Sequence, residues 1–149
     1  MTVKQISVFV ENKPGMLAEL ANALNENKIN MRALSLAETK DFGIIRLILD
    51  DPFNAVRVLK DCGYVCSITK VLAIAISNQP GSLGKVMQIL GDNQINVEYT
   101  YAFTAGVKDK ACMILRVGDN EKAIEALTKN GVKPLCQDDL DEQIGRAHV

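Results

Sequence analysis

Two short segments of the chain carry groups that could bind a ligand. They read NKPGML at residues 12–17 and NQPGSL at residues 78–83, so both follow the pattern Asn-x-Pro-Gly-x-Leu. In each case an alternating apolar run precedes the pattern, and leucines with helical spacing follow it. The pattern therefore predicts a turn from a strand into a helix, and it predicts this turn twice in one chain.

The backbone of such a turn is suited to binding a carboxylate. Proline fixes φ and lacks an amide that the first helical turn could not pair anyway, and glycine lets another group approach the backbone closely. The next amides point out of the helix N-terminus, where the helix dipole also favours an anion. The amides expected to bind belong to Gly15, Met16 and Leu17 and, in the second copy, to Gly81, Ser82 and Leu83.

Four asparagines are candidate partners for the same ligand. Asn12 and Asn78 stand two residues before Pro14 and Pro80, and their side chains can both donate and accept hydrogen bonds. Asn30 and Asn96 stand at the start of the next strand of the predicted sheet. An Asx turn explains the first pair equally well, and a strand entry explains the second pair.

The two leucines of the pattern have a simpler explanation. Leu17 begins the stripe that Leu20, Ala21 and Leu24 continue at i, i+3, i+4 and i+7, and Leu83 begins the equivalent stripe of the second copy. We therefore expect both to anchor a helix in the core, although they also belong to the candidate ligand-binding set.

The turn is part of a longer internal repeat. Asn12, Pro14 and Gly15 match Asn78, Pro80 and Gly81 at an offset of 66 residues, and after ETKDFG the offset becomes 68. Each copy predicts a strand, a helix, a hairpin of two strands, a second helix and a final strand, the last near YVCSITK and VKPLC. We therefore predict an α+β protein of two ferredoxin-like βαββαβ repeats, each a four-stranded antiparallel sheet with two helices on one face.

The repeats suggest the domain boundaries. We expect a first domain at residues 1–70, a second at residues 71–137 and a polar tail at residues 138–149 that contains His148. Because the small residues Ala73, Ala75 and Ser77 share the outward face of one strand, we also expect another element to pack there, in an interface between repeats and in a homodimer.

These residues resemble a known family. The chain is similar to a tandem pair of ACT domains, which are small βαββαβ regulatory modules on enzymes of amino-acid metabolism. The resemblance rests on the two Asn-x-Pro-Gly-x-Leu segments, the helix stripes after them, and Asn30 and Asn96. It implies a free amino acid or a similar small carboxylate bound between paired domains, at the turn and the neighbouring second strand. It also implies a partner enzyme of amino-acid metabolism.

Composition argues against several other classes of protein. Lys and Arg number 17 against 18 Asp and Glu, so the formal net charge is −1 and no basic field attracts nucleic acid or an anionic membrane. The chain begins without a signal-peptide pattern, and no apolar run approaches the roughly 20 residues of a membrane span. We therefore expect a cytoplasmic protein that binds neither nucleic acid nor membranes, with reduced cysteines.

The cysteines do not predict a metal site. Cys62, Cys66, Cys112 and Cys136 lack the spacing of metal ligands, and His148 is the single histidine. We expect the cysteines to pack in the core, and we expect no metal and no other cofactor.

Three functional hypotheses follow. The first is a non-catalytic regulatory protein that binds an amino acid, with the second turn favoured for polar ligands because Ser82 adds a hydroxyl. The second is a ligand-free structural subunit that binds a partner enzyme. The third, an enzyme or an RNA-binding protein on the same fold, is disfavoured: no Arg lies near either turn. Tyr99, Tyr101 and Phe103 are expected to be buried on one face with Ile95 and Val97.

Overall fold

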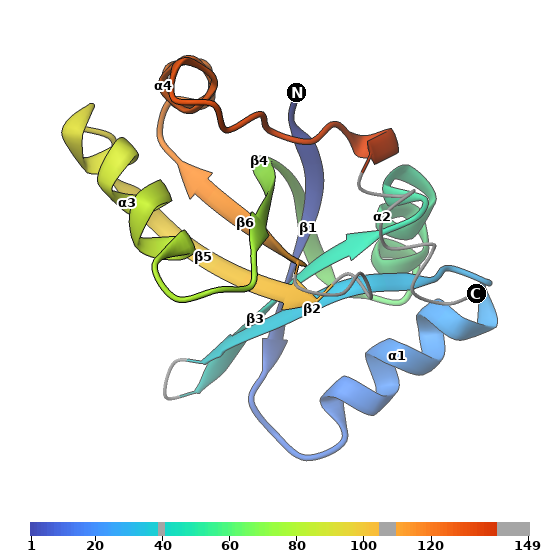
Figure 1. Ribbon diagram of the computed structural model, residues 1–149. Helices are drawn as coiled ribbons and strands as arrows, with labels where there is room; N and C mark the ends of the chain where they lie inside the picture. The colour runs from blue at the N-terminus through green and yellow to red at the C-terminus, as the bar shows by residue number, and fades with distance from the viewer. Residues whose placement is uncertain (39–40, 105–109, 140–149) are drawn as a thin grey trace. The chain divides into compact units, whose positions relative to one another are not determined.

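The structure is a computed structural model that describes residues 1–38, 41–104 and 110–139 (Figure 1). The chain divides into two compact units, Lys4–Thr69 and Lys70–Val149 with Met1–Val3. Part of the predicted hairpin tip ETKDFG and most of the predicted tail, His148 included, lie outside the described residues.

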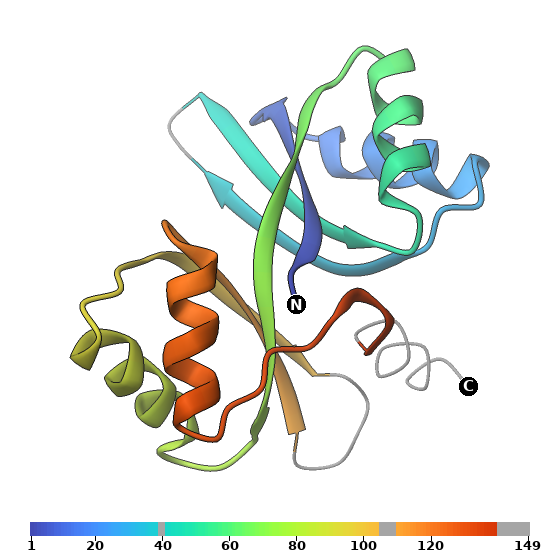
Figure 2. The same ribbon diagram turned by 90° about the horizontal axis from the view of Figure 1, so that it is seen from above.

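The first unit contains the element order that the repeat predicts. Its elements are β1 (Val3–Glu11), α1 (Met16–Glu26), β2 (Met31–Glu38), β3 (Phe42–Leu49), α2 (Pro52–Asp61) and the beginning of β4 (Val65–Ser77). Strand β3 pairs antiparallel with both β1 and β2, with Ile6 opposite Leu47 and Leu36 opposite Ile45. The two helices cover one face of these strands (Figure 2).

The core of this unit follows from the strand alternation and the helix stripe. Ile6 and Val8 point to the helices together with Ile45 and Leu47, and Leu20 of α1 packs against them. Burial of each such side chain contributes about 1.5–3 kcal/mol.

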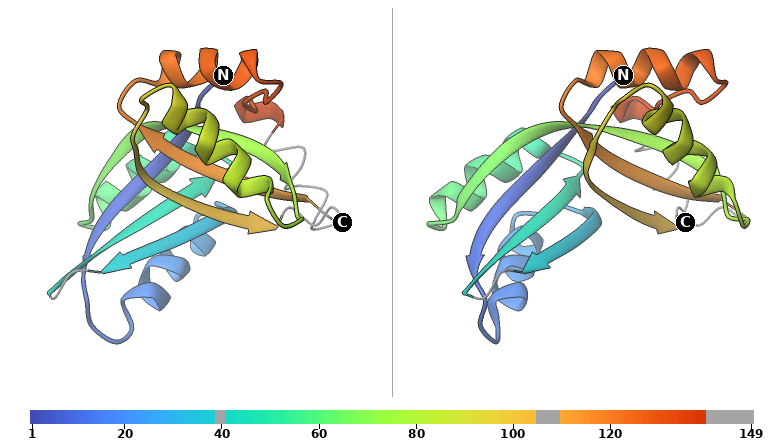
Figure 3. Two further views of the ribbon diagram at one scale, coloured as in Figure 1. Left: turned by 60° about the vertical axis from the view of Figure 1, so that its left-hand side comes forward. Right: turned by 90° about the vertical axis from the view of Figure 1, so that its left-hand side faces the viewer.

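The second unit repeats this arrangement. Its elements are the rest of β4, α3 (Ser82–Asp92), β5 (Val97–Thr104), β6 (Lys110–Val117) and α4 (Asn120–Lys129). Strand β6 pairs antiparallel with β4 and β5, and α3 and α4 cover the face that carries Leu72, Ile74 and Leu115 (Figure 3).

The strands follow the order β2-β3-β1-β4-β6-β5, and every pair whose register is described is antiparallel. The protein is therefore α+β with a six-stranded sheet, and the pattern of each repeat is consistent with a ferredoxin-like unit. The last strand predicted for the second repeat is replaced by a single bridge, in which the Leu135 amide donates to the Ala73 oxygen at 2.7 Å. Pro134 has no amide to continue the ladder, so the pairing ends there.

Of the small residues on β4, Ala73 takes part in this bridge. Ala73 is fully buried, and Leu135 of the same unit is the residue that approaches it. A bridge pairs strands edge to edge, so the prediction that an element packs on the outward face, in an interface between repeats and in a homodimer, stays a prediction.

A β-bulge changes the face of the aromatic residues on β5. The register shifts between Val97 and Tyr99, as it does between Met31 and Ala33 in the first repeat. Val97 packs on the core beneath the helices, whereas Tyr99 lies opposite Arg116 and Tyr101 opposite Ile114 on the other face. The prediction that the aromatic residues share a face with Ile95 and Val97 was wrong, because one extra residue reverses the alternation.

The cysteines do not all belong to the core. Cys66 and Cys112 are buried as predicted, but Cys62 is exposed after the end of α2 and Cys136 is half-buried. The Cys136 thiol donates to the Asp139 carboxylate at 3.1 Å. Among the described residues no His, Cys, Asp and Glu side chains gather into a group that could hold a metal ion. No helix in the described part of the chain is both long enough and apolar enough to cross a membrane.

Candidate functional site

Both Pro-Gly turns adopt the same backbone conformation. Gly15 has φ +88° and Gly81 has φ +90°, and each is the residue before a helix that begins at Met16 or Ser82. A Cβ atom at either glycine would meet no other atom within 4 Å. The glycines are therefore required by the left-handed backbone rather than by crowding, and the space beside each is open.

The helices that follow these turns lack a side-chain cap, whereas the other two helices have one. Neither Gly15 nor Gly81 can cap through a side chain, but Asp51 accepts from the Asn54 amide and Asp119 from the Lys122 amide. A helix leaves its first amides without intrahelical partners, and an aspartate cap satisfies one of them. In each repeat the uncapped helix is the one that follows the Pro-Gly turn.

The amides at these helix starts differ in their partners. The Met16 amide donates to the Lys13 oxygen at 3.4 Å and the Ser82 amide to the Gln79 oxygen at 3.2 Å, so the expectation that these two are unpaired was wrong. The amides one and two residues further on have no protein acceptor in the part of the chain that the structure describes. They belong to Leu17, Ala18, Leu83 and Gly84.

A pocket of about 260 Å³ lies beside the first turn, and we call it the first-turn pocket. The turn residues 11–18 form one side of it, and Val10, Leu36, Gly43 and Ile45 form its apolar floor. Leu17 lines this pocket and is 42% exposed, so it does not anchor α1 in the core as expected. The helix stripe turns inward only from Leu20 onwards.

Charged groups of both signs surround the first-turn pocket. Lys13 Nζ lies 3.3 Å from Glu11 Oε2, and both residues line the pocket. The Asn12 side chain donates to Glu38 Oε2 at 3.3 Å, and the Asn12 amide donates to the Asp41 oxygen at 3.2 Å. Pairs this exposed contribute little to stability, but they place a cation and carboxylates next to unpaired amides.

The second turn borders a pocket of different chemistry, which we call the second-turn pocket. Its volume is about 220 Å³, and its polar lining residues are Ser77, Ser82, Lys85 and Lys133. Neither lysine lies within ion-pair distance of a carboxylate among the described residues, although Asp139 is near enough to Lys133 for the lysine to help lower the pKa of that carboxyl. The main cause of that low pKa is the hydrogen bond from Cys136. Leu83 is 48% exposed and does not line this pocket, so its expected role in the core was also wrong.

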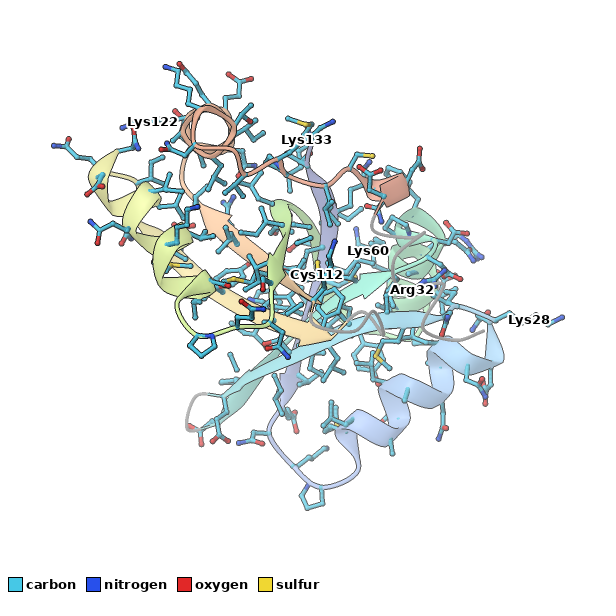
Figure 4. All side chains as sticks on the ribbon, viewed as in Figure 1. Lys28, Arg32, Lys60, Cys112, Lys122 and Lys133 are labelled. Atoms are coloured by element: carbon cyan, nitrogen blue, oxygen red, sulfur yellow. The ribbon has the colours of Figure 1, made fainter. Side chains whose placement is uncertain are left out.

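Within each repeat, the structure does not bring Asn30 or Asn96 to the turn. The Asn30 amide donates to Asp50 after β3, whereas the turn lies near the other end of β3, where Val10 is opposite Gly43. Leu49 lies six positions after Gly43 along the strand, which is about 20 Å. Asn96 lines a separate pocket of about 430 Å³ with Asp119 and Lys122. Figure 4 likewise places Lys28, two residues before Asn30, beyond the end of α1 that is remote from the turn.

Sequence reasoning missed the residues of the pocket floor. Gly43 interrupts an apolar strand, which is a signal for close approach in a sheet, and the offset of 68 pairs it with Ala111. Leu36 is paired with Ala102 at the offset of 66. Comparison of the two copies could therefore have identified this floor.

Comparison with known proteins identifies the family. A family model described as an ACT domain pair matches residues 1–144, and the chain therefore belongs to the family of ACT domain pairs. A search of curated proteins gave no match.

Several solved structures are similar to the chain. Protein BT0572 from Bacteroides thetaiotaomicron is 39% identical with a TM-score of 0.88, and the match covers 94% of this chain and 96% of that one. The ligand-free regulatory subunit of aspartate kinase from Thermus thermophilus is 16% identical with a TM-score of 0.62, and the match covers 85% and 91%. The corresponding subunit from Thermus flavus is 16% identical with a TM-score of 0.59 over 85% and 90%. The two Thermus structures show a shared fold.

Proposed function

We propose that the protein is a non-catalytic regulatory protein that binds a free amino acid at its Pro-Gly turns. The observation that carries this proposal is the pairing of uncapped helix starts with adjacent pockets, in a chain that belongs to the ACT domain pairs. We further propose that the two compact units act as the two domains of the pair.

The first turn offers complementary groups for both ends of a zwitterion. The unpaired amides of Leu17 and Ala18, together with the helix dipole, would bind the α-carboxylate. The carboxylate of Glu11 would accept from the ammonium group, and Lys13 lies beside it to balance the charge. The ligand side chain would then lie on the apolar floor.

Regulation requires that binding be read by another molecule. We propose that the ligand favours one of two arrangements of the protein and that a partner enzyme of amino-acid metabolism responds to this shift, with the protein acting as a homodimer. The support for this step is the similarity to two structures that are named regulatory subunits of aspartate kinase.

Thermal unfolding against the twenty common amino acids tests the proposal. At a hundredfold its dissociation constant, a ligand stabilises the protein by about 2.7 kcal/mol, which raises the unfolding midpoint by roughly 2–8 °C. We expect such a shift for a subset of the amino acids. If the panel gives no shift, the turns bind no amino acid and the structural-subunit hypothesis replaces this one.

The variant Leu17→Asp separates binding from folding. An acidic side chain in the first turn of α1 interacts favourably with the helix dipole, which adds about 0.3–1 kcal/mol to the free energy of unfolding. Leu17 is exposed, so its replacement loses little packing. The same carboxylate would repel the ligand carboxylate, so we expect the part of the thermal shift that comes from the first turn to disappear while the free protein keeps its stability. Leu83→Asp makes the same change at the second turn and should remove the part of the shift that comes from that turn. If both variants keep the full ligand shift, the ligand binds elsewhere.

A further inference from the structure

We propose that the first-turn pocket selects an amino acid with an apolar side chain and that Gly43 determines the size of the side chain it accepts. This inference rests on the proposed function and names the ligand class of one of its two sites. It follows from the floor of the pocket, which the second repeat does not share.

The floor is apolar and its shape depends on a missing side chain. Val10 and Ile45 are buried, Leu36 is exposed, and Gly43 lies opposite Val10 on the paired strand. A Cβ atom at Gly43 would stand 3.2 Å from Leu36 Cδ1 and 3.4 Å from Val10 Cγ2. These two side chains therefore already pack over Gly43, and one added methyl group would force the exposed Leu36 to shift and change the shape of the floor.

Among the described residues, the side chains that form this floor, those of Val10, Leu36 and Ile45, carry no charge and no hydrogen-bonding group. The charged lining residues are Glu11, the last residue of β1, and Lys13 of the turn, and the two charged ends of an amino acid would bind beside them. A polar ligand side chain on the floor would lose its water without gaining a partner, and that loss is costly, whereas an apolar one gains from burial. At about 260 Å³ the pocket is smaller than the roughly 300–1,000 Å³ typical of drug-sized ligands, so a single amino acid suits it.

The second repeat has different residues at the equivalent positions. Ala111 stands opposite Ile76 where Gly43 stands opposite Val10, and Ala102 takes the place of Leu36. The same register thus accommodates an alanine in place of the glycine, and two lysines and two serines line the second-turn pocket beside its apolar residues. The preference for an apolar side chain is accordingly a property of the first turn.

Calorimetric titration with leucine, methionine, phenylalanine, alanine, aspartate and glutamine tests this proposal. We expect the wild-type protein to bind the larger apolar amino acids most tightly. Gly43→Ala should weaken the affinity for the larger apolar amino acids by about tenfold or more compared with the affinity for free alanine. One methylene in an apolar pocket changes affinity by about 10–200-fold. Leu36→Ala, which removes a side chain that is 46% exposed, should shift the preference toward phenylalanine.

Gly91→Ala provides the matched control. It makes the same chemical change in α3, where a Cβ atom would meet no other atom within 4 Å, and we expect it to leave every affinity unchanged. If aspartate or glutamine binds most tightly at the site that Leu17→Asp abolishes, or if Gly43→Ala leaves all affinities of that site unchanged, the apolar selectivity is wrong and the proposed function stands. If no amino acid binds, both are wrong.

Discussion

The two Pro-Gly turns have nearly the same backbone but different surroundings. Gly15 and Gly81 differ by 2° in φ, and the helices after them both lack a side-chain cap. The pocket beside the first turn has an apolar floor with charges of both signs at its rim, whereas the pocket beside the second carries Lys85 and Lys133. A duplicated motif thus conserves the backbone groups that suit a carboxylate and leaves the side-chain environment free to differ.

The contrast extends to the sheet beneath each turn. The position next to Gly43 is Ile44, and its counterpart is Cys112. Cys112 is 1% exposed and lies among the strands (Figure 4). Burial raises the pKa of this thiol to about 12. The second repeat therefore contains a buried ionisable group where the first has a hydrocarbon.

The largest expected effect is a loss of stability in alkali that depends on Cys112. The unfolded thiol loses its proton near pH 9 and the folded one near pH 12, so the unfolded chain binds fewer protons in this window and stability falls as pH rises. The loss is about 1.4 kcal/mol per pH unit, or about 2 kcal/mol at pH 10.5. Urea unfolding at pH 7, 9 and 10.5 under reducing conditions should show a smaller alkaline loss in Cys112→Ala than in the wild type.

Cys62→Ala is the control, because Cys62 is exposed and should not change the alkaline loss. Equal alkaline losses in Cys112→Ala and the wild type would show that the thiol ionises without cost in the fold. The two repeats would then not differ in this respect.

An intermediate effect tests the contrast between capped and uncapped helices. Asp51→Ala and Asp119→Ala each remove a side-chain acceptor for a first-turn amide, at 3.3 Å and 3.1 Å. We expect each to lower the free energy of unfolding by about 1 kcal/mol, measured by urea unfolding at pH 7. If neither changes stability, water satisfies these amides as well as aspartate does, and the uncapped helices at the Pro-Gly turns are not special.

The smallest effect concerns a position where the repeats should behave alike. Lys28 and Gln94 both have φ +57°, a left-handed conformation that costs a residue other than glycine about 1–2 kcal/mol. Lys28→Gly and Gln94→Gly remove that cost. Glycine also gives the unfolded chain more conformational entropy, which lowers the free energy of unfolding by about 0.4–1 kcal/mol. We expect each to raise the free energy of unfolding by a few tenths of a kcal/mol to about 1 kcal/mol. Opposite signs for the two variants would show that the repeats differ here too.

Much of the fold could be predicted because the responsible signals are local and occur twice. The alternation of Ile6, Val8 and Val10 predicted β1, and the Pro-Gly pair predicted the start of each first helix. Errors arose where one residue changed the geometry. The extra residue at Glu98 reversed the face of Tyr99, and Pro134 reduced a predicted strand to one bridge.

The candidate site was harder to predict because its parts come from distant segments. The turn and its glycine were recognisable, but which leucines of the stripe are buried depends on how α1 crosses the sheet, and Leu17 lies outside that contact. Asn30 is on a strand of the same sheet, but the hairpin register places it at the far end from the turn within its repeat.

The chain by itself determined two repeats of strand, helix, hairpin and helix and two helix entrances built on Pro-Gly, since φ restrictions and hydrophobic periodicity act between neighbouring residues. Tertiary structure alone decided what surrounds each entrance, because strand pairing brings residues some 30 positions apart onto one floor. If the backbone amides of Leu17 and Ala18 proved to donate to acceptors of the protein itself, they could not bind a carboxylate at the first turn.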